Sequence, residues 1–599
     1  MVARITTGAL WGVDAYRVDV EVSLTQALPN VIVIGLPDGA VKEARMRIEA
    51  SVRALGVKMP NKRVTFSLAP SDRRKGGSSF DLPMAVGLLE ALELVPIGST
   101  RGTAFAGELG LDGSLRPVRG VLAQARLARE EGCRQIVVPK DNAGEAAVIR
   151  DITVLGASSL SDVALHLIGR ETLPETPLLE PNLMPRDDGM DLLDVRGQPV
   201  ARRALEIAAA GGHHLIYLGP PGTGKSMLAR RLPGLLPPMS LDEAVQVTQI
   251  YSAAGLLGDR PLVEYRPFRA PHHTATEVAL IGGGHHQVRV GELSLAHLGV
   301  LFLDEAAEFP RSVLDALREP IENGEVDICR AEHRVRLPAR SQMVIALNPC
   351  PCGYRGQERR GRSCTCTPSM ADRYLRRLSG PLLDRVDLQL ELEPVPMSAL
   401  QGPPDAEPTR VVRQRVLNAR KAQARRLEEK GRPRLNAWMS TAEMRAHCSL
   451  EPEARRIVHL RAEQQGLSAR GLDRVLRVAR TTADLDGAKN IRARDVYEAL
   501  SYRTLEQLLR RGRMVPEDEK LDGKRSSKRA RPLGPIKAAR SLSSSRLRDL
   551  KPDDDGSKAT GGSKSSSVGS CSKGLELESR ASTQSQMSLL APSYGNEKG

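Results

Sequence analysis

The chain has 599 residues, of which 41% are hydrophobic, 27% are charged and only 3% are aromatic. This composition is ordinary for a globular protein, and it argues against a protein that binds bases mainly by stacking them on aromatic rings. Basic residues exceed acidic residues by 87 to 72, a net charge of +15, which makes a polyanionic partner plausible.

The lack of a recognisable targeting signal and the small number of cysteines predict a cytoplasmic protein. The sequence has no apolar run long enough to cross a membrane, and Asp14 and Arg17 interrupt the only stretch that a signal peptide could use. Eight cysteines in so long a chain do not make a disulfide framework. We therefore predict a cytoplasmic protein without a membrane partner.

The predicted elements in chain order indicate three folded domains and a tail. Residues 1–171 alternate β-branched runs with helical stretches, which predicts an α+β or α/β domain. Residues 172–190 are proline-rich and are expected to form an extended linker. A second α/β domain is predicted for 191–395, and a helical domain without strands for 396–513. The expected strands of the first domain are Tyr16–Ser23, Asn30–Ile34, Arg63–Leu68 and Ile136–Val138, and its helices include Ala40–Ala54 and Leu122–Glu131.

The tail, residues 514–599, carries part of the positive charge. It contains 16 basic and 11 acidic residues and no apolar periodicity, so it cannot bury enough apolar surface to offset the entropy of ordering and is predicted to be disordered. Either it contacts nucleic acid non-specifically or it is simply solvated.

The strongest motif is a glycine-rich loop between the apolar run Leu215–Leu218 and the helical stretch Met227–Leu232. The loop consists of Gly219, Pro220, Pro221, Gly222, Thr223, Gly224, Lys225 and Ser226. Glycines let backbone N–H groups point at phosphates, and the start of the helix adds a favourable dipole. Lys225 is expected to bind the β- and γ-phosphates of ATP, and Ser226 to offer its hydroxyl to Mg²⁺.

Two further apolar runs end in polar residues suited to hydrolysis. Val300–Leu303 precedes Asp304 and Glu305, and Met343–Leu347 precedes Asn348. Because the carboxyl ends of parallel strands meet at one sheet edge, these side chains are expected beside the glycine-rich loop. Asp304 would hold Mg²⁺, Glu305 would orient or deprotonate the attacking water, and Asn348 would position that water.

This order of motifs resembles that of AAA+ ATPases, and longer stretches resemble the magnesium-chelatase-like branch and its ComM/YifB family. The matching stretches are 35–38, 80–83, 266–273, 291–297, 299–305 and 379–387. The resemblance covers roughly residues 1–510. It implies an α/β fold: a P-loop parallel-sheet ATPase core with a helical lid, preceded by an α+β domain like that of Lon protease and of ribosomal protein S5 domain 2.

The resemblance also implies a homohexameric ring in which a neighbour completes each ATP site. Arg385 matches the arginine-finger position of the family, and Arg470 matches the sensor-2 position. From the residues alone, Arg385 could instead form a surface ion pair. Arg470 could be one arginine among several, since others follow at 474, 477 and 480.

The activity that the resemblance implies is an ATP-driven motor on single-stranded or branched DNA. Such a motor would promote branch migration during natural transformation and recombination. The alternatives are a chelatase-type ATPase that remodels proteins or inserts metal, and an ATP-dependent protease.

Residues 326–337 alternate around a short polar turn, which predicts a β-hairpin. In this branch of AAA+ proteins such a hairpin projects toward the central pore. Arg330, His333 and Arg334 near its tip are then candidates for contacts with DNA phosphates, which carry no sequence specificity. A solvated turn is the alternative.

Four cysteines form two Cys-x-Cys pairs separated by 11 residues: Cys350, Cys352, Cys364 and Cys366. Four thiolates in one loop suit tetrahedral Zn²⁺, although the usual spacing within a pair is two residues. Zinc and reduced loop thiols therefore both remain open. Three His pairs, at 213–214, 272–273 and 285–286, lie in separate segments without an HExxH motif and do not predict a metalloprotease.

The stretch Lys75–Phe80 places Ser79 where the Lon family carries its nucleophilic serine. The partner lysine of that family is expected at position 122, where this sequence has Leu122. A serine hydroxyl without a base is not activated, so we predict a protease-like domain that is not a protease.

Overall fold

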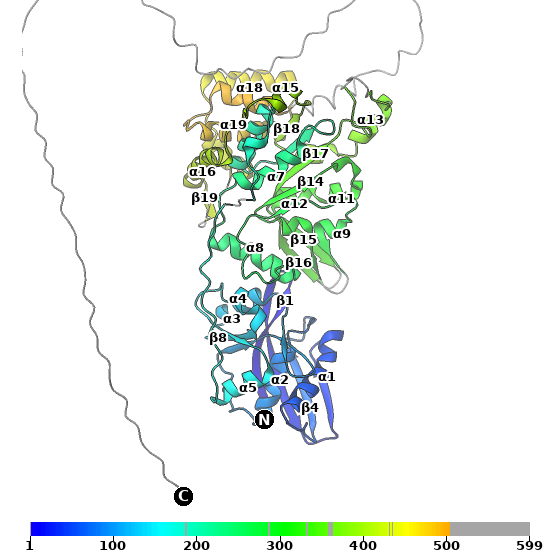
Figure 1. The fold of residues 1–599 in the computed structure, drawn as a ribbon, viewed down its shortest axis with the longest axis vertical. Helices are drawn as coiled ribbons and strands as arrows, with labels where there is room; N and C mark the ends of the chain where they lie inside the picture. The colour runs from blue at the N-terminus through cyan, green and yellow to red at the C-terminus, as the bar shows by residue number, and fades with distance from the viewer. Residues whose placement is uncertain are drawn as a thin grey trace, which may run out of the picture. The chain divides into compact units, whose positions relative to one another are not determined.

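The structure is a computed structural model that describes residues 2–503 except 186–187, 285–287, 331–332, 357–362, 430–431, 434 and 466. These residues belong to one compact unit (Figure 1). The predicted tail lies outside the described residues. Among the residues described, no helix combines the length and the apolar character needed to span a membrane.

The N-terminal region is built on a seven-stranded mixed sheet with the strand order β3-β4-β2-β1-β5-β8-β9. Its strands are β1 (Val2–Trp11), β2 (Asp14–Thr25), β3 (Asn30–Ile34), β4 (Arg63–Ala69), β5 (Thr103–Phe105), β8 (Gln135–Pro139) and β9 (Thr153–Ala157), and β6 (Glu108–Leu109) pairs with β7 (Leu115–Arg116) apart from it. Its helices are α1 (Gly39–Ala54), α2 (Asp81–Ala91), α3 (Val121–Glu130), α4 (Lys140–Ala146) and α5 (Leu160–Ile168). The four predicted strands and two predicted helices are confirmed within two residues at each end.

Strand β1 was not predicted, although it pairs with β2 along its whole length. Its sequence mixes Thr, Gly and Ala with only a few large apolar residues, so it lacks the clear alternation of β2, in which Val18, Val20 and Val22 are all buried. Helix α2 packs against both strands and is buried along its entire length. The proline-rich segment forms no helix or strand among its described residues. It runs beside β9, where the Thr176 N–H donates to the Val154 carbonyl at 2.8 Å.

The second region contains a five-stranded parallel sheet with the order β11-β14-β17-β10-β18. The strands are β11 (Phe268–Arg269), β14 (Val300–Leu303), β17 (Gln342–Leu347), β10 (Leu215–Leu218) and β18 (Leu388–Glu391). Around them lie α6 (Pro199–Gly211), α7 (Lys225–Leu235), α8 (Leu241–Ala254), α9 (Glu277–Ile281), α10 (Glu292–Leu295), α11 (Arg311–Ala316), α12 (Arg318–Asn323), α13 (Pro368–Leu375) and α14 (Gly380–Leu383). The antiparallel pairs are β12 (Gly282–Gly283) with β13 (Arg289–Val290), and the predicted hairpin, β15 (Glu325–Arg330) with β16 (His333–Pro338).

The strands β10 and β14 are apolar at every position and buried throughout, as expected for a parallel sheet that is covered on both faces. On β10, Leu215 and Tyr217 belong to a buried cluster shared with α6 and α7, whereas Ile216 and Leu218 belong to a second cluster shared with α8, α11 and the hairpin. Successive side chains of a strand point to opposite faces, so the alternation divides one apolar run between two cores. Figure 1 shows β14 and β17 side by side within this sheet, as their register requires.

The turn between β1 and β2 joins the N-terminal region to the ATPase region. Val13 in this turn is buried with Val335 and Leu337 of the β15–β16 hairpin. The Gln249 side-chain amide, on α8, donates to the Val13 carbonyl at 2.8 Å and to the Asp14 carboxylate at 2.7 Å. Helices α3 and α8 also share a buried cluster.

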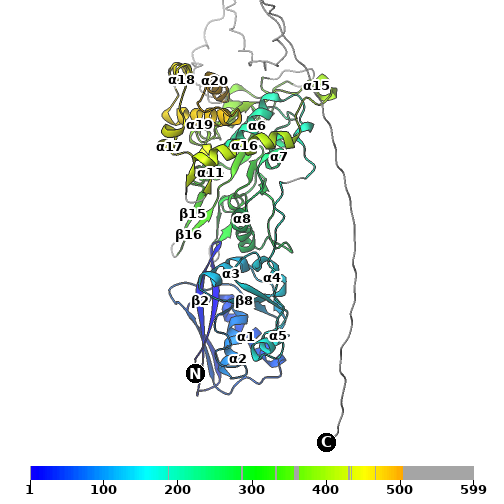
Figure 2. The same ribbon diagram turned by 90° about the vertical axis from the view of Figure 1, so that its left-hand side faces the viewer.

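The third region is helical but includes one short hairpin. Its helices are α15 (Met397–Gln401), α16 (Thr409–Arg426), α17 (Thr441–His447), α18 (Pro452–Gln465), α19 (Ala469–Leu485) and α20 (Ala493–Ser501). The expectation of no strand was wrong, because β19 (Glu428–Glu429) pairs with β20 (Arg432–Pro433). Two paired residues on each side of a turn have no apolar periodicity to reveal them. In Figure 2, α16 and α19 lie against α6, with which both are in contact.

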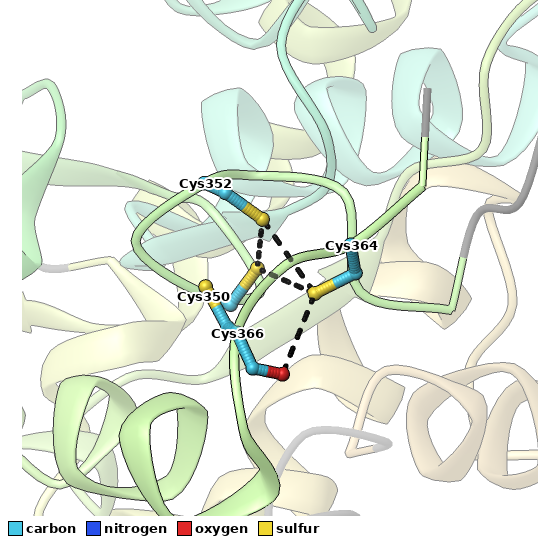
Figure 3. A group of neighbouring side chains, drawn as sticks. All are labelled: Cys350, Cys352, Cys364 and Cys366. Carbon is cyan, nitrogen blue, oxygen red and sulfur yellow. Dashed lines mark hydrogen bonds between the residues drawn. The ribbon is translucent and has the colours of Figure 1, made fainter. Parts of the chain in front are cut away.

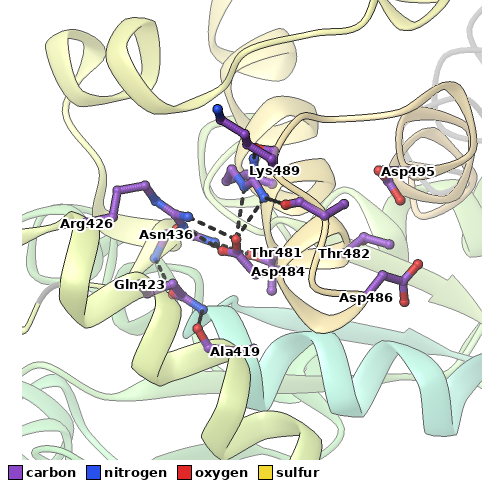
Figure 4. A network of polar contacts seen from close by, with 12 residues as sticks. Ala419, Gln423, Arg426, Asn436, Thr481, Thr482, Asp484, Asp486, Lys489 and Asp495 are labelled. Carbon is purple, nitrogen blue, oxygen red and sulfur yellow. Dashed lines mark hydrogen bonds and ion pairs between the residues drawn. The ribbon is translucent and has the colours of Figure 1, made fainter.

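A buried polar network holds this helical region together (Figure 4). Asp484 accepts from Arg426 at 2.6 Å and from the Asn436 side-chain amide at 2.8 Å, and it forms an ion pair with Arg480 at 2.9 Å. The Gln423 side chain connects Asn436 to the Ala210 carbonyl at the end of α6. Removing the Asp484 carboxylate would leave the guanidinium groups of Arg426 and Arg480 without their buried partner, which costs about 3–5 kcal/mol.

A second buried network ties α19 to the edge of the ATPase sheet. Asp387, just before β18, accepts from Arg474 at 2.8 Å and lies 3.1 Å from His213 Nδ1. The other ring nitrogen of His213 lies 2.7 Å from the Thr481 hydroxyl. Burial alone would raise the pKa of Asp387, but the charge of Arg474 and the hydrogen bond with His213 hold it well below its usual range. The ionised carboxylate therefore connects the two regions.

His214 makes the stability of this core depend on pH. Its side chain is buried, and its Nδ1 accepts from the Met343 N–H at 3.0 Å. Burial lowers the pKa of His214 from 6.5 to about 4. Between these two values the unfolded chain binds a proton that the folded chain does not, so stability falls as pH decreases. We expect a loss of about 1.4 kcal/mol per pH unit over this window, measured by urea unfolding.

The matched control is His214→Asn, whose side-chain oxygen can accept the same hydrogen bond without titrating. Its stability should fall less steeply between pH 6.5 and 4. Equal slopes for the two proteins would show that His214 does not carry the effect.

Candidate functional site

The glycine-rich loop lies between β10 and α7, as the sequence predicted. Gly222 and Gly224 have φ values of +81° and +89°, which side chains with a Cβ rarely adopt. A Cβ on Gly219 would lie 2.6 Å from the Leu392 carbonyl oxygen. These glycines are therefore required for the shape of the loop, which ends in the first turn of α7, where backbone N–H groups suit a phosphate.

Lys225 lies at the centre of the loop. Its ammonium donates to the carbonyls of Gly219 and Pro220 at 2.6 and 3.0 Å, and to the side-chain oxygen of Asn348 at 3.1 Å. Burial lowers the pKa of Lys225, while Asp304 and Glu305 oppose that shift. None of these three hydrogen-bond acceptors is a carboxylate, so no negative charge in direct contact offsets the ammonium, and it is suited to bind a phosphate.

Two of the predicted magnesium ligands lie in direct contact. The Ser226 hydroxyl donates to Asp304 Oδ2 at 2.8 Å, and Asp304 Oδ1 accepts from the Glu305 N–H at 3.0 Å. A hydroxyl and a carboxylate are hard oxygen ligands, which Mg²⁺ prefers. The residues present therefore fit an ATP–Mg²⁺ site: Lys225 and the loop would hold the phosphates, and Ser226 and Asp304 would hold the ion.

Glu305 follows β14 in a left-handed conformation, with φ of +49°. For a residue other than glycine this conformation costs about 1–2 kcal/mol. The carboxylate is exposed, and His273 Nδ1 lies 3.8 Å from it. A place for His273 beside the catalytic glutamate was not predicted from the sequence. The one available signal was its position shortly after the strand that becomes the neighbour of β14.

Arg385 follows α14 and forms an ion pair within the same chain. Its guanidinium donates to Glu322 at 2.9 Å and to the Pro381 carbonyl at 2.8 Å. Its own carbonyl accepts from Arg474 at 2.9 Å. Within one chain Arg385 thus forms an ion pair, which is the alternative to an arginine finger that the residues alone left open.

Arg470 differs from the other arginines of α19. Arg474 pairs with Asp387, Arg477 donates to the Met439 carbonyl at 2.6 Å, and Arg480 pairs with Asp484. Arg470 is exposed in the first turn of the helix. It makes no hydrogen bond or ion pair with the part of the chain that the structure describes. Three of the four arginines of α19 therefore have structural roles, and Arg470 has no such partner among the described residues.

The β15–β16 hairpin brings Arg334 opposite Cys329, one pair from its tip. Arg334 is exposed and pairs with Asp327 at 3.0 Å, and Arg336 shares the same carboxylate. The side chains of Arg330 and His333 lie outside the described residues. Their predicted contacts with DNA stay predictions.

The four cysteines meet in the loop that follows Asn348 (Figure 3). Cys350 Sγ lies 3.3 Å from Cys352 Sγ and 3.7 Å from Cys364 Sγ, and all four sulfurs lie within 4.8 Å of one another. None of them forms a disulfide. The structure therefore brings together the four thiols that the sequence singled out. His285–His286, in contrast, lies outside the described residues, and His213 and His214 are used in the core.

Ser79 precedes α2 and is largely buried. Leu122, at the position where a lysine was expected, is fully buried in α3. The nearby Lys75 donates its ammonium to the Arg73 carbonyl at 2.8 Å. No hydrogen bond of the Ser79 hydroxyl to a described residue is present. Within the described ranges, no basic side chain is therefore hydrogen-bonded to the Ser79 hydroxyl.

Comparison with known proteins agrees with this architecture. Family models match three stretches: magnesium chelatase, subunit ChlI, at residues 191–400; subunit ChlI of Mg-chelatase at 20–142; and the ChlI C-terminal model at 406–503. The uncharacterised protein YifB of Escherichia coli is 42% identical over 507 residues, which cover 84% of this chain and 97% of YifB. The competence protein ComM of Haemophilus influenzae is 41% identical over 514 residues, 85% of this chain and 99% of ComM.

The chain belongs to the ComM/YifB family of magnesium-chelatase-like AAA+ ATPases. Shorter matches connect it to Lon proteases. Lon protease 2 of Bacillus subtilis is 30% identical over 76 residues, 13% of each chain. Together with the parallel sheet, these matches confirm the predicted fold, an AAA+ core combined with a Lon-like domain. An AAA+ core of this family implies ATP and Mg²⁺ as ligands.

Two substitutions separate binding from hydrolysis at this site. Lys225→Ala should abolish ATP binding, because it removes the ammonium at the centre of the loop. Glu305→Gln should keep ATP binding but lower the hydrolysis rate by about a hundredfold or more, because an amide cannot accept a proton from water. Fluorescent-nucleotide binding and phosphate release measure the two effects. Full hydrolysis by Glu305→Gln would assign the base to another residue.

Proposed function

We propose that this protein is an ATP-driven motor that acts as a homohexamer on single-stranded or branched DNA and promotes branch migration in natural transformation and recombination. The observation that carries the ATPase part is the convergence of Lys225, Asp304 and Asn348 at one edge of a parallel sheet. The DNA part is supported by similarity over almost the whole length of a relative named competence protein ComM.

Each polar group around the loop has one role in the proposed reaction. Lys225 and the loop amides bind the phosphates, and Ser226 and Asp304 hold Mg²⁺, which supplies positive charge against the transferring phosphoryl group. Glu305 accepts the proton of the attacking water, and Asn348 orients that water while it contacts Lys225. His273, 3.8 Å from Glu305, helps to hold the glutamate in place.

Arg385 and Arg470 complete the proposed site. Arg385 acts on the ATP of the neighbouring subunit after leaving Glu322, and it stabilises charge that develops on the phosphoryl group. Arg470 acts as sensor 2, which is consistent with its exposed side chain. The hydrogen bond from Arg474 to the Arg385 backbone gives the helical region a direct connection to the finger.

A mixing experiment tests the proposal that Arg385 acts in trans. Arg385→Ala alone should lower ATP hydrolysis by about a thousandfold or more, and Lys225→Ala should be inactive. A mixture of the two variants should regain part of the activity, because some interfaces combine an intact loop with an intact Arg385. Arg53→Ala, which removes an exposed arginine on α1, is the control. Absence of rescue in hexamers that contain both variants would contradict a role in trans.

DNA should stimulate hydrolysis, and the hairpin should contribute to this effect. We expect Arg334→Ala to raise the DNA concentration for half-maximal stimulation severalfold, since each lost phosphate contact weakens binding. Arg336→Ala is the matched control. It also removes one positive charge that pairs with Asp327, but at a position further from the tip of the hairpin. Assays at low salt with single-stranded, duplex and forked DNA, and a branch-migration assay, measure the effects.

The result that would overturn the DNA proposal is a hydrolysis rate indifferent to all three DNA forms at low salt. That outcome would favour the second candidate, a chelatase-type ATPase that remodels proteins or inserts metal, which the chelatase family models support. Within the N-terminal domain we propose no peptide hydrolysis, because Leu122 replaces the base that Ser79 would need.

A further inference from the structure

The loop that carries the four cysteines borders the nucleotide site on two sides. It begins directly after Asn348, whose side chain contacts Lys225. Further along it, Gly353 has a φ of +83°, and a Cβ there would lie 2.7 Å from Pro221 Cδ in the glycine-rich loop. The backbone at Gly353 therefore packs directly on Pro221. A change in the shape of the cysteine loop would therefore displace Asn348, which contacts Lys225, or Pro221 in the glycine-rich loop.

The sulfur positions fit one tetrahedral metal ion. With Zn–S bonds of about 2.3 Å, a tetrahedral site separates its sulfurs by about 3.8 Å. The hydrogen-bond distances among Cys350, Cys352 and Cys364 are 3.3, 3.7 and 3.5 Å, and Cys366 lies within 4.8 Å of each. Disulfides require a far shorter separation. An iron–sulfur cluster distributes its cysteines over several irons and so needs a wider arrangement.

The described parts of this loop have few other means of keeping their shape. Residues 348–356 and 363–367 form no helix or strand. The Gly353 N–H donates to the Cys350 carbonyl at 2.9 Å, and Arg355 pairs with Asp372 at 3.0 Å. Four thiol groups in contact gain little from one another when protonated, and they repel when ionised. A bound cation converts the same four groups into a cross-link between the two halves of the loop.

We propose that Cys350, Cys352, Cys364 and Cys366 bind one Zn²⁺ ion, and that this ion holds the loop against Pro221 and Asn348 so that zinc occupancy sets the affinity for ATP. The role is structural: all four positions of the ion are filled by protein sulfur, which leaves none for a substrate. The coupling rests on the proposed nucleotide-binding role of Lys225, which Asn348 contacts, and it is independent of any action on DNA.

The first experiment measures zinc and nucleotide binding on the full chain in reducing buffer. We expect one zinc per chain by elemental mass spectrometry for the wild type and for Cys133→Ser, which removes a free cysteine in the N-terminal region. Cys364→Ser and Cys366→Ser should lose the zinc, and their dissociation constant for a fluorescent ATP analogue with Mg²⁺ should rise by about tenfold. Zinc far below one per chain, or iron in its place, would overturn the assignment.

Two further measurements guard against misfolded variants. Stripping zinc from the wild type with a chelator should weaken nucleotide binding, and adding Zn²⁺ back should restore it. Gly353→Ala should keep its zinc but bind nucleotide more weakly, because its Cβ displaces Pro221. Unchanged nucleotide affinity in the stripped wild type would refute the coupling. Absence of nucleotide binding in the zinc-loaded wild type would instead refute the proposed ATPase site.

Discussion

The parallel register of β10, β14 and β17 is the constraint on which the site depends. Leu218 pairs with Leu347, and Leu303 pairs with Ile345, so the three strands end at the same edge of the sheet. Whatever residue follows each strand must then lie beside the residues that follow the others. The contacts of Asn348 with Lys225 and of Ser226 with Asp304 follow from this register.

Buried charge extends the same constraint into the helical region. Asp387 precedes the edge strand β18, and its carboxylate pairs with Arg474 and contacts His213. Thr481 then connects His213 to the network around Asp484. Such ionised groups are stable in a core only when they are fully paired. The helical region and the sheet are therefore bound to each other in one arrangement, and movement of α19 would act on the backbone of Arg385.

Sequence patterns predicted the regular part of this structure well. The strand ends at Asp304 and Asn348, the loop at Lys225 and the pairing of the cysteine motifs all follow from local spacing, and the fold agrees with each. Sequence patterns failed to predict strands that lack alternation or are very short. Strand β1 lacks alternation, and the β19–β20 hairpin has two residues on each side. The His272–His273 pair was noted, but the place of His273 beside Glu305 was not predicted, because the distance between the two side chains is a property of neighbouring strands.

The sequence by itself determined the chemistry available at the site. A lysine and a serine at the start of a helix, carboxylates after an apolar strand and four clustered thiols are fixed by covalent order. Only the tertiary structure decided which similar residues are free to act. Arg474 and Arg480 have buried carboxylate partners, whereas Arg470 is exposed. The packing of Gly353 against Pro221, which joins the cysteine loop to the glycine-rich loop, is likewise a tertiary contact. The reason is physical: burial and pairing depend on residues far apart in the chain, and a linear pattern does not contain those distances.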